Sequence, residues 1–285
     1  MSPTRDRAVM KLDLNAAWDQ AVRLIAANRE VMLVLGGVFF FLPYVLFLLL
    51  APMPDFAAVA GPSGENTPAL RSAMSGFLAD YWWAILLLTL VQTLGAIAVM
   101  AVIGDPTRPT VRAAMQRGAA YLLPNFGAQL LTSLAAMLVL FVALFVGKLS
   151  GSKPVIATLS VFSLPVIIWL LTRLSLSGAA IAIELLANPL TALRRSWRLT
   201  AGNGLRLVAF YLLLFLAFFV ILQVLGLIVG VFTALPGAEI AHVLGALLSG
   251  VIYAVLILIG YAVLASVHRQ LARAERVSVP VSHEA

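Results

Sequence analysis

Long apolar runs alternate with shorter polar stretches along the chain. Six runs approach or exceed the roughly 20 residues that a helix needs to cross a hydrocarbon core about 30 Å thick. Backbone groups left unpaired in lipid are costly, so these runs should be helical, and they lack the alternation of a transmembrane β-barrel. We therefore predict an all-α polytopic membrane bundle with six transmembrane helices, at about residues 31–51, 81–104, 121–147, 154–185, 205–235 and 241–267.

Three polar stretches carry an amphipathic helical pattern directly before a span. Their apolar positions are Leu14, Trp18, Ala21 and Ile25 in the first, Val111, Met115, Gly118 and Leu122 in the second, and Leu190, Leu193, Trp197 and Ala201 in the third. Helices of this kind suit the headgroup layer. The order of amphipathic helix, span, external turn and span predicts a threefold repeat. The alternative is that basic amphipathic stretches simply accompany any even number of spans.

Short polar signals mark where these amphipathic helices begin and end. Asn188 followed by Pro189 predicts a helix start, with the asparagine as N-cap and the proline in the first turn. Gly202, Asn203 and Gly204 predict a break before the fifth span. An asparagine stands at each of the three joints, at Asn28, Asn125 and Asn203.

Lysines and arginines fall on alternate sides of the predicted spans. Sixteen of the 19 lie in the leader, in the loop after the second span, around the loop after the fourth, and in the tail, starting with Arg5, Arg7 and Lys11 and including Arg108. Only Arg71, Lys148 and Lys153 lie in the other loops. Basic residues favour the cytoplasmic side. We therefore predict a cytoplasmic leader (1–30), a membrane domain (31–267) and a cytoplasmic tail (268–285).

The composition agrees with lipid as the main solvent. The chain of 285 residues is 62% hydrophobic and 11% charged, against roughly 45–50% and 25% for soluble domains. The absence of cysteine excludes disulfides and thiolate metal sites. The net charge of +7 lies beside the spans, which argues against nucleic acid as a partner. The excess of arginine over lysine is typical of a GC-rich bacterial genome, so we expect a bacterial inner-membrane protein.

Two charged residues at the inner end of the fourth span stand out, Arg173 and Glu184. If the span ends near Thr172, Arg173 reaches the interface. If the span continues to about Glu184, Arg173 is buried and needs a partner. Eleven residues of helix separate them by about 16 Å, so they cannot pair directly. We favour a long helix with Glu184 beyond the boundary, where it can meet Arg194, Arg195 or Arg198.

Other polar or small residues in the spans predict packing rather than chemistry. Gly226 with Gly230, and Gly245 with Ser249, have the spacing of close helix contacts. Pro165 lies inside the fourth span and could break it. The histidines lie apart, and the only His-Glu dipeptide is His283–Glu284 at the end of the chain. No catalytic or metal-binding motif is present, so we expect neither a cofactor nor enzymatic activity.

Residues 173–203, RLSLSGAAIAIELLANPLTALRRSWRLTAGN, carry the most specific pattern in the sequence. They resemble a bacterial family named for the membrane domain of glycerophosphoryl diester phosphodiesterases. The resemblance rests on Arg173, Ser175, Glu184, Pro189, Ser196, Trp197, Arg198, Leu199 and Thr200. In that family the domain can be fused to a catalytic barrel that hydrolyses glycerophosphodiesters. This chain has no room for such a barrel, so the resemblance implies the fold and a link to lipid but not the activity.

Our leading hypothesis is a non-catalytic inner-membrane protein that engages anionic lipid or a membrane partner through its cytoplasmic arginine-rich helices. The candidate residues are Arg173, Glu184, Arg194, Arg195, Trp197, Arg198 and Arg206. For any one arginine, a role in topology alone is the simpler interpretation. A transporter or channel subunit is the second hypothesis, although the spans lack the charges that such proteins use. A lipid or phosphodiester enzyme is the third. A homo-oligomer would be compatible with any of the three.

Overall fold

The computed structural model describes residues 12–51, 54, 59, 67–104, 109–234 and 237–278. Within these ranges every regular element is a helix. Six helical segments are long and apolar enough to cross a membrane: Arg29–Leu50, Pro68–Gly104, Leu122–Leu149, Lys153–Glu184, Gly204–Val231 and Ile240–Arg276. The prediction of an all-α polytopic protein with six spans is therefore confirmed. Arg5, Arg7, Lys11, Arg108, His283 and Glu284, named above, lie outside the described residues.

The elements follow one another in a recurring order. They are α1 (Leu14–Ala27), α2 (Arg29–Gly36), the π-helical η1 (Gly37–Phe41), α3 (Leu42–Leu50), α5 (Thr67–Gly104), α6 (Val111–Ala120), α7 (Leu122–Leu149), α8 (Lys153–Leu174), α9 (Ser177–Glu184), α10 (Pro189–Leu199), α11 (Gly204–Ala234) and α12 (Ala238–Ser278). Three times, a short helix (α1, α6 or α10) precedes two long apolar segments. These short helices are the three amphipathic ones that the sequence predicts.

Each short helix begins on a side chain that accepts a backbone hydrogen bond. Asp13 accepts from the N–H of Ala16, Thr110 accepts from Ala113, and Asn188 accepts from Leu190 and Thr191. These caps satisfy N–H groups that the first turn of a helix leaves without a partner. The predicted start at Asn188–Pro189 is confirmed. The chain turns before α11 at Gly202, whose φ of 79° favours glycine.

The core lies where the short helices meet the ends of the long ones. Residues 96–103 of α5 are all buried, so this stretch of alanine, valine, isoleucine and methionine is enclosed on every side. An all-round apolar helix is expected at such a position. Against α5 pack α6, α9 and α12, while α1 packs on α12 and α10 packs on α9; we call this assembly the hub.

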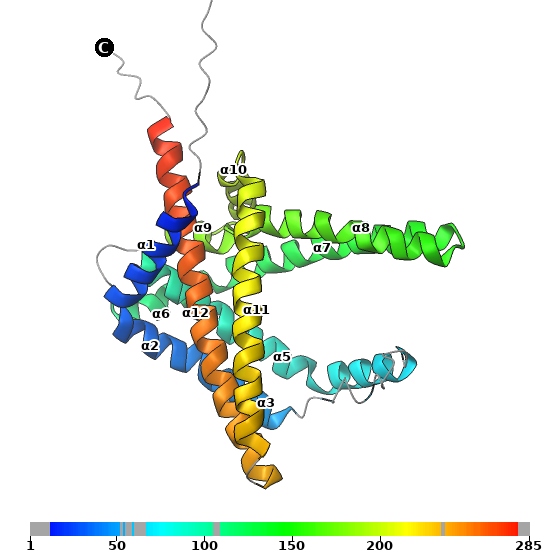
Figure 1. Ribbon diagram of the computed structural model, residues 1–285. Helices are drawn as coiled ribbons and strands as arrows, with labels where there is room; N and C mark the ends of the chain where they lie inside the picture. The colour runs from blue at the N-terminus through cyan, green and yellow to red at the C-terminus, as the bar shows by residue number, and fades with distance from the viewer. Residues whose placement is uncertain are drawn as a thin grey trace, which may run out of the picture.

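The spans spread outward from the hub rather than forming a tight bundle. In Figure 1, α11 and α12 run downward, whereas the α7–α8 hairpin projects to the right, across their direction. Little of α7 and α8, and none of the most apolar window of α11, is buried. One flat bilayer can contain all six spans only after the hairpin turns toward α11 and α12.

Two of the helices extend beyond the apolar runs expected from the sequence, and the fourth segment is divided. The second span is part of a helix that begins at Thr67, and the sixth continues as helix to Ser278. The fourth is not one long helix, because α8 ends at Leu174 and α9 begins at Ser177. Pro165 lies inside the uninterrupted α8. The break therefore has another cause, which the contacts of α10 explain.

Close helix contacts lie at glycines that were not predicted from the sequence. A Cβ atom added to Gly250 of α12 would lie 2.3 Å from Cγ2 of Val45, and one added to Gly95 of α5 would lie 2.4 Å from Cβ of Phe39. At Gly226 no atom would lie within 4 Å. The prediction that Gly226 mediates close packing is therefore wrong for the described part of this chain.

Candidate functional site

The hydroxyl of Ser196 in α10 binds backbone groups at the break between α8 and α9. It accepts a hydrogen bond from the N–H of Leu176 at 3.1 Å and donates one to the carbonyl oxygen of Arg173 at 2.8 Å. Thr200 adds a longer contact to the same carbonyl, at 3.4 Å. Ser196 and Thr200 are both fully buried. Together they replace helical hydrogen bonds that the break removes, because buried backbone groups need partners.

Arg173 lies beside two tryptophans rather than opposite a carboxylate. Its guanidinium carbon is 4.5 Å from the ring centroid of Trp197 and 5.7 Å from that of Trp169. The two rings meet edge to face at 5.1 Å. Arginine stacked on tryptophan contributes on the order of 0.5–2 kcal/mol. Arg173 therefore joins α8 to α10, and the expectation that it does not pair with Glu184 is confirmed.

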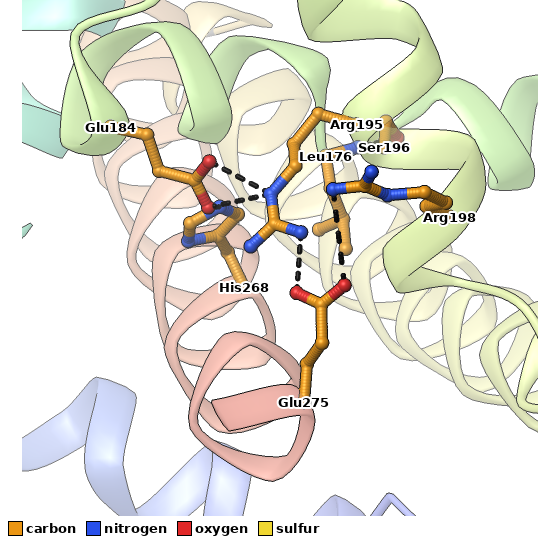
Figure 2. Close-up of polar contacts among 7 residues, drawn as sticks. All are labelled: Leu176, Glu184, Arg195, Ser196, Arg198, His268 and Glu275. Carbon is orange, nitrogen blue, oxygen red and sulfur yellow. Dashed lines mark hydrogen bonds and ion pairs between the residues drawn. The ribbon is translucent and has the colours of Figure 1, made fainter. Parts of the chain in front are cut away.

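Glu184, at the end of α9, pairs with Arg195 of α10. The Nε atom of Arg195 donates to the two carboxylate oxygens at 3.0 and 2.8 Å. The Nη1 atom of the same guanidinium contacts Glu275 of α12, and Nη2 of Arg198 lies 3.9 Å from Glu275. Figure 2 shows Arg195 between the two carboxylates. Of the three arginines expected near Glu184, Arg195 is the one that binds it.

Charge around Arg195 keeps this guanidinium protonated. Burial alone would lower its pKa, but hydrogen bonds to Glu184 and Glu275 and the negative charge of both carboxylates outweigh burial and raise the pKa above its ordinary value. Arg195 is thus a permanent cation that ties α9, α10 and α12 together.

His268 of α12 is a second basic side chain beside Glu184. Its Nε2 atom lies 3.0 Å from Oε1 of Glu184, and the side chain is only 1% exposed. The angle between the imidazole ring and the carboxylate is unsuited to a hydrogen bond. Neither ring nitrogen of His268 has a hydrogen-bond partner in the described part of the chain. The contact is an ion pair only when the imidazole is protonated.

Two open hollows flank the ion pairs. The larger, of about 810 Å³, is lined by Glu184, Leu186, Thr191, Arg194, Arg195, Arg198, Glu275 and Arg276. We call it the arginine groove, since four arginines face two glutamates there. The second, of about 430 Å³, shares Glu184, Arg195 and Arg276 with it and adds Arg269 and Arg273. Guanidinium groups form paired hydrogen bonds with phosphate oxygens, so this excess of positive charge suits a phosphate-bearing anion.

The structure separates the predicted site residues into three places. Glu184, Arg194, Arg195 and Arg198 line the arginine groove. Arg173 and Trp197 form the stack described above. Arg206 is exposed in the first turn of α11 and is not among the residues that line the groove.

His268, Glu275 and Arg276 also line these hollows, and the sequence analysis missed them. It ended the sixth helix at residue 267, whereas α12 continues to Ser278. His268 and Glu275 are seven residues apart and therefore share one helix face. Continuing the helix beyond the apolar run would have brought both to the same side. In the described ranges, no three histidine, aspartate or glutamate side chains gather to hold a metal ion.

Comparison with known proteins identifies a family to which the chain belongs. The family model described as Domain of unknown function (DUF7847) matches residues 12–271. No curated protein matches the chain, and no solved structure does.

Proposed function

Starting from the finding that the chain belongs to the DUF7847 family, we propose that it is a non-catalytic integral membrane protein that binds the anionic headgroups of membrane lipids in the arginine groove. The observation that carries the proposal is the geometry of this groove. Arg194 and Arg198 line it and are exposed, while Arg195 is held from behind by Glu184. A phosphate group can thus reach two exposed arginines beside a third whose position is already fixed.

The charge pattern of the sequence supports a cytoplasmic position for the groove. Its arginines belong to the sixteen basic residues that favour the inner side of a bacterial inner membrane, with both ends of the chain in the cytoplasm. The inner leaflet carries anionic lipids, and each nearby arginine contributes about 1 kcal/mol of attraction to them. Cardiolipin and phosphatidylglycerol are therefore the proposed ligands.

The resemblance of residues 173–203 to the membrane domain of glycerophosphoryl diester phosphodiesterases supports the link to lipid. The proposal does not extend to hydrolysis. Purified protein should release no glycerol-3-phosphate from glycerophosphocholine. Release above the level of an empty-membrane control would contradict a non-catalytic role.

The groove is tested by removing charges that the fold does not need. Arg194→Gln with Arg198→Gln removes two exposed arginines of the groove and leaves Arg195 in place. The matched control, Arg23→Gln with Arg112→Gln, removes two exposed arginines from α1 and α6, which also precede spans. Native mass spectrometry of protein in nanodiscs measures how much cardiolipin and phosphatidylglycerol stays bound.

The groove variant should lose about 2 kcal/mol of binding, or roughly thirtyfold in affinity, since each charge contributes about 1 kcal/mol. The control variant should retain its lipid within about threefold, because screening weakens distant charges. Equal losses in both variants would show that only the total charge matters. Unchanged retention in the groove variant would remove the proposed site.

A further inference from the structure

A second cavity, separate from the arginine groove, lies at the base of the α7–α8 hairpin. It has a volume of about 340 Å³ and lies between α5, α7, the end of α8, α9 and α12. Its polar lining comes from Asn125, Gln129, Thr132, Ser133, Ser175, Ser177 and Tyr261. Apolar atoms of Met100 and of leucines complete the walls, and no charged residue lines it. It has no lining residue in common with the arginine groove.

Three polar side chains of this cavity have no hydrogen-bond partner within the described residues, whereas Gln129 and Ser175 do have partners. Asn125 is only 2% exposed, yet its side-chain amide has no hydrogen-bond partner in the described residues. The hydroxyls of Ser133 and Ser177 lack such a partner there too. Gly178 makes room for the amide, because a Cβ atom on it would lie 3.2 Å from Oδ1 of Asn125. None of these side-chain atoms is among the fully enclosed atoms without a partner in the described residues, so they face the open cavity and can form hydrogen bonds with what enters it.

The lining limits the chemistry of what binds. A charged group would lose its hydration without meeting an opposite charge, which is unfavourable in a membrane-embedded site. Hydroxyl groups both donate and accept, as do the amides and hydroxyls of the cavity. The apolar walls accommodate carbon atoms. The volume exceeds that of a few water molecules, each of which occupies about 30 Å³ in the liquid.

We propose that this cavity binds an uncharged group with neighbouring hydroxyls. Two sources offer that chemistry: a free polyol such as glycerol, and the glyceryl headgroup of a neutral lipid such as a monoacylglycerol. Asn125 supplies the central donor and acceptor. Ser133 and Ser177 bind from either side, and Tyr261 closes the wall formed by α12. This site acts independently of the anionic headgroups proposed for the arginine groove.

The absence of cysteine from the sequence makes a direct test simple. The variant Ser133→Cys places one thiol in the cavity. The variant Met137→Cys places one about a turn further along α7, at a position that is 66% exposed and is not among the residues that line the cavity. Each protein, in nanodiscs, is treated with the small uncharged reagent methyl methanethiosulfonate, and the labelling rate is followed by intact-mass spectrometry.

The cysteine at residue 133 should react, and ligand should protect it. At a ligand concentration about three times the dissociation constant, labelling should slow roughly fourfold. Protection by glycerol in the buffer identifies the free polyol. Protection only by monooleoylglycerol in the nanodisc identifies the lipid headgroup. A cysteine at residue 137 should show no protection in either arm.

Three results would overturn the proposal. One is no labelling at residue 133, and another is labelling that neither ligand slows. The third is equal protection by glycerol-3-phosphate, which would remove the requirement for an uncharged ligand.

The role of the amide is tested in the Ser133→Cys background. Asn125→Leu should abolish protection, whereas Gln223→Leu, which removes an exposed amide from α11, should preserve it. If Asn125→Leu does not fold, Ser177→Ala provides the same test with a smaller change. Protection that survives in the folded cavity variant would contradict the assigned site.

Discussion

The contacts of Ser196 explain part of the sequence pattern in residues 173–203, the segment that resembles a known family. A serine hydroxyl can accept and donate at once, and Ser196 does both, across a break in the neighbouring chain segment. Trp197 covers Arg173, and Arg198 reaches Glu275 from the exposed side of α10. Most side chains of the motif thus connect α10 to its neighbours. Only the arginines that face the groove remain available for a ligand.

Replacing Ser196 with alanine should therefore destabilise the protein. The N–H of Leu176 loses its side-chain acceptor in a buried setting, a change that costs about 1–3 kcal/mol. Ser75→Ala is the control, since Ser75 is exposed and binds only the carbonyl of Ser72 in its own helix. Thermal unfolding in a fixed detergent compares the two variants. A Ser196→Ala variant as stable as the control would show that Thr200 alone provides the hydrogen bonds that the backbone at the break needs.

Arg195 and Arg198 should respond differently to the same change. Arg195→Gln removes hydrogen bonds to two carboxylates and leaves Glu184 beside His268, so we expect a loss of about 2–3 kcal/mol in stability. Arg198 is 71% exposed, and Arg198→Gln should cost less than about 1 kcal/mol. Chemical unfolding of both variants measures the difference. Equal effects would mean that Arg195 does not hold the hub together.

Features that the bilayer imposes on every residue could be predicted from the sequence, whereas contacts that depend on distant elements could not. Hydropathy located the six spans, because lipid excludes unpaired backbone groups throughout the core. Helix geometry excluded a pair between Arg173 and Glu184 and left three arginines as candidates. Helix geometry could not identify Arg195 as the partner of Glu184, because the pairing depends on how α10 lies against α9. The break at Ser175–Leu176 was missed because its cause, Ser196, lies some twenty residues away.

At the scale of whole helices, packing depends on where a glycine faces rather than on its spacing. Gly226 and Gly250 both have a small residue four positions away, Gly230 for the first and Ala246 and Ala254 for the second, but only Gly250 has neighbouring atoms, from Val45 and Phe41. Both facts follow from the arrangement of the helices. In the described chain, α12 packs on α3 and α5, while α11 is largely exposed.

Alanine substitutions should distinguish these two glycines. Gly250→Ala forces Val45 and Phe41 to move and should cost about 1–3 kcal/mol, as overpacking does. Gly226→Ala meets no neighbour and should stay within about 1 kcal/mol of the parent, in either direction. Retention of structure in a mild-to-harsh detergent series provides the measurement. A destabilising Gly226→Ala would point instead to a contact of α11 with a second copy of the chain.

At the scale of the whole molecule, the α7–α8 hairpin has a joint at each end. Tyr121 separates α6 from α7, and Ser175–Leu176 separates α8 from α9, so neither helix runs continuously into the hub. The two helices pack against each other along their length, which lets them turn as one body. The polar cavity lies at the base of this hairpin. A turn toward α11 and α12 would therefore change how far the cavity is enclosed.

A bilayer should bring about this turn, since it confines the tips of all spans to one of its two surfaces. Spin labels on Lys153→Cys, at the tip of the hairpin, and Ile240→Cys, at the start of α12, report the movement. Their separation, measured by pulsed electron paramagnetic resonance, should be shorter and more narrowly distributed in nanodiscs than in detergent. A second pair, Arg23→Cys and Arg273→Cys, lies on α1 and α12, which pack together in the hub, and should keep its separation. If both pairs give the same distances in the two environments, the hairpin is fixed to the hub.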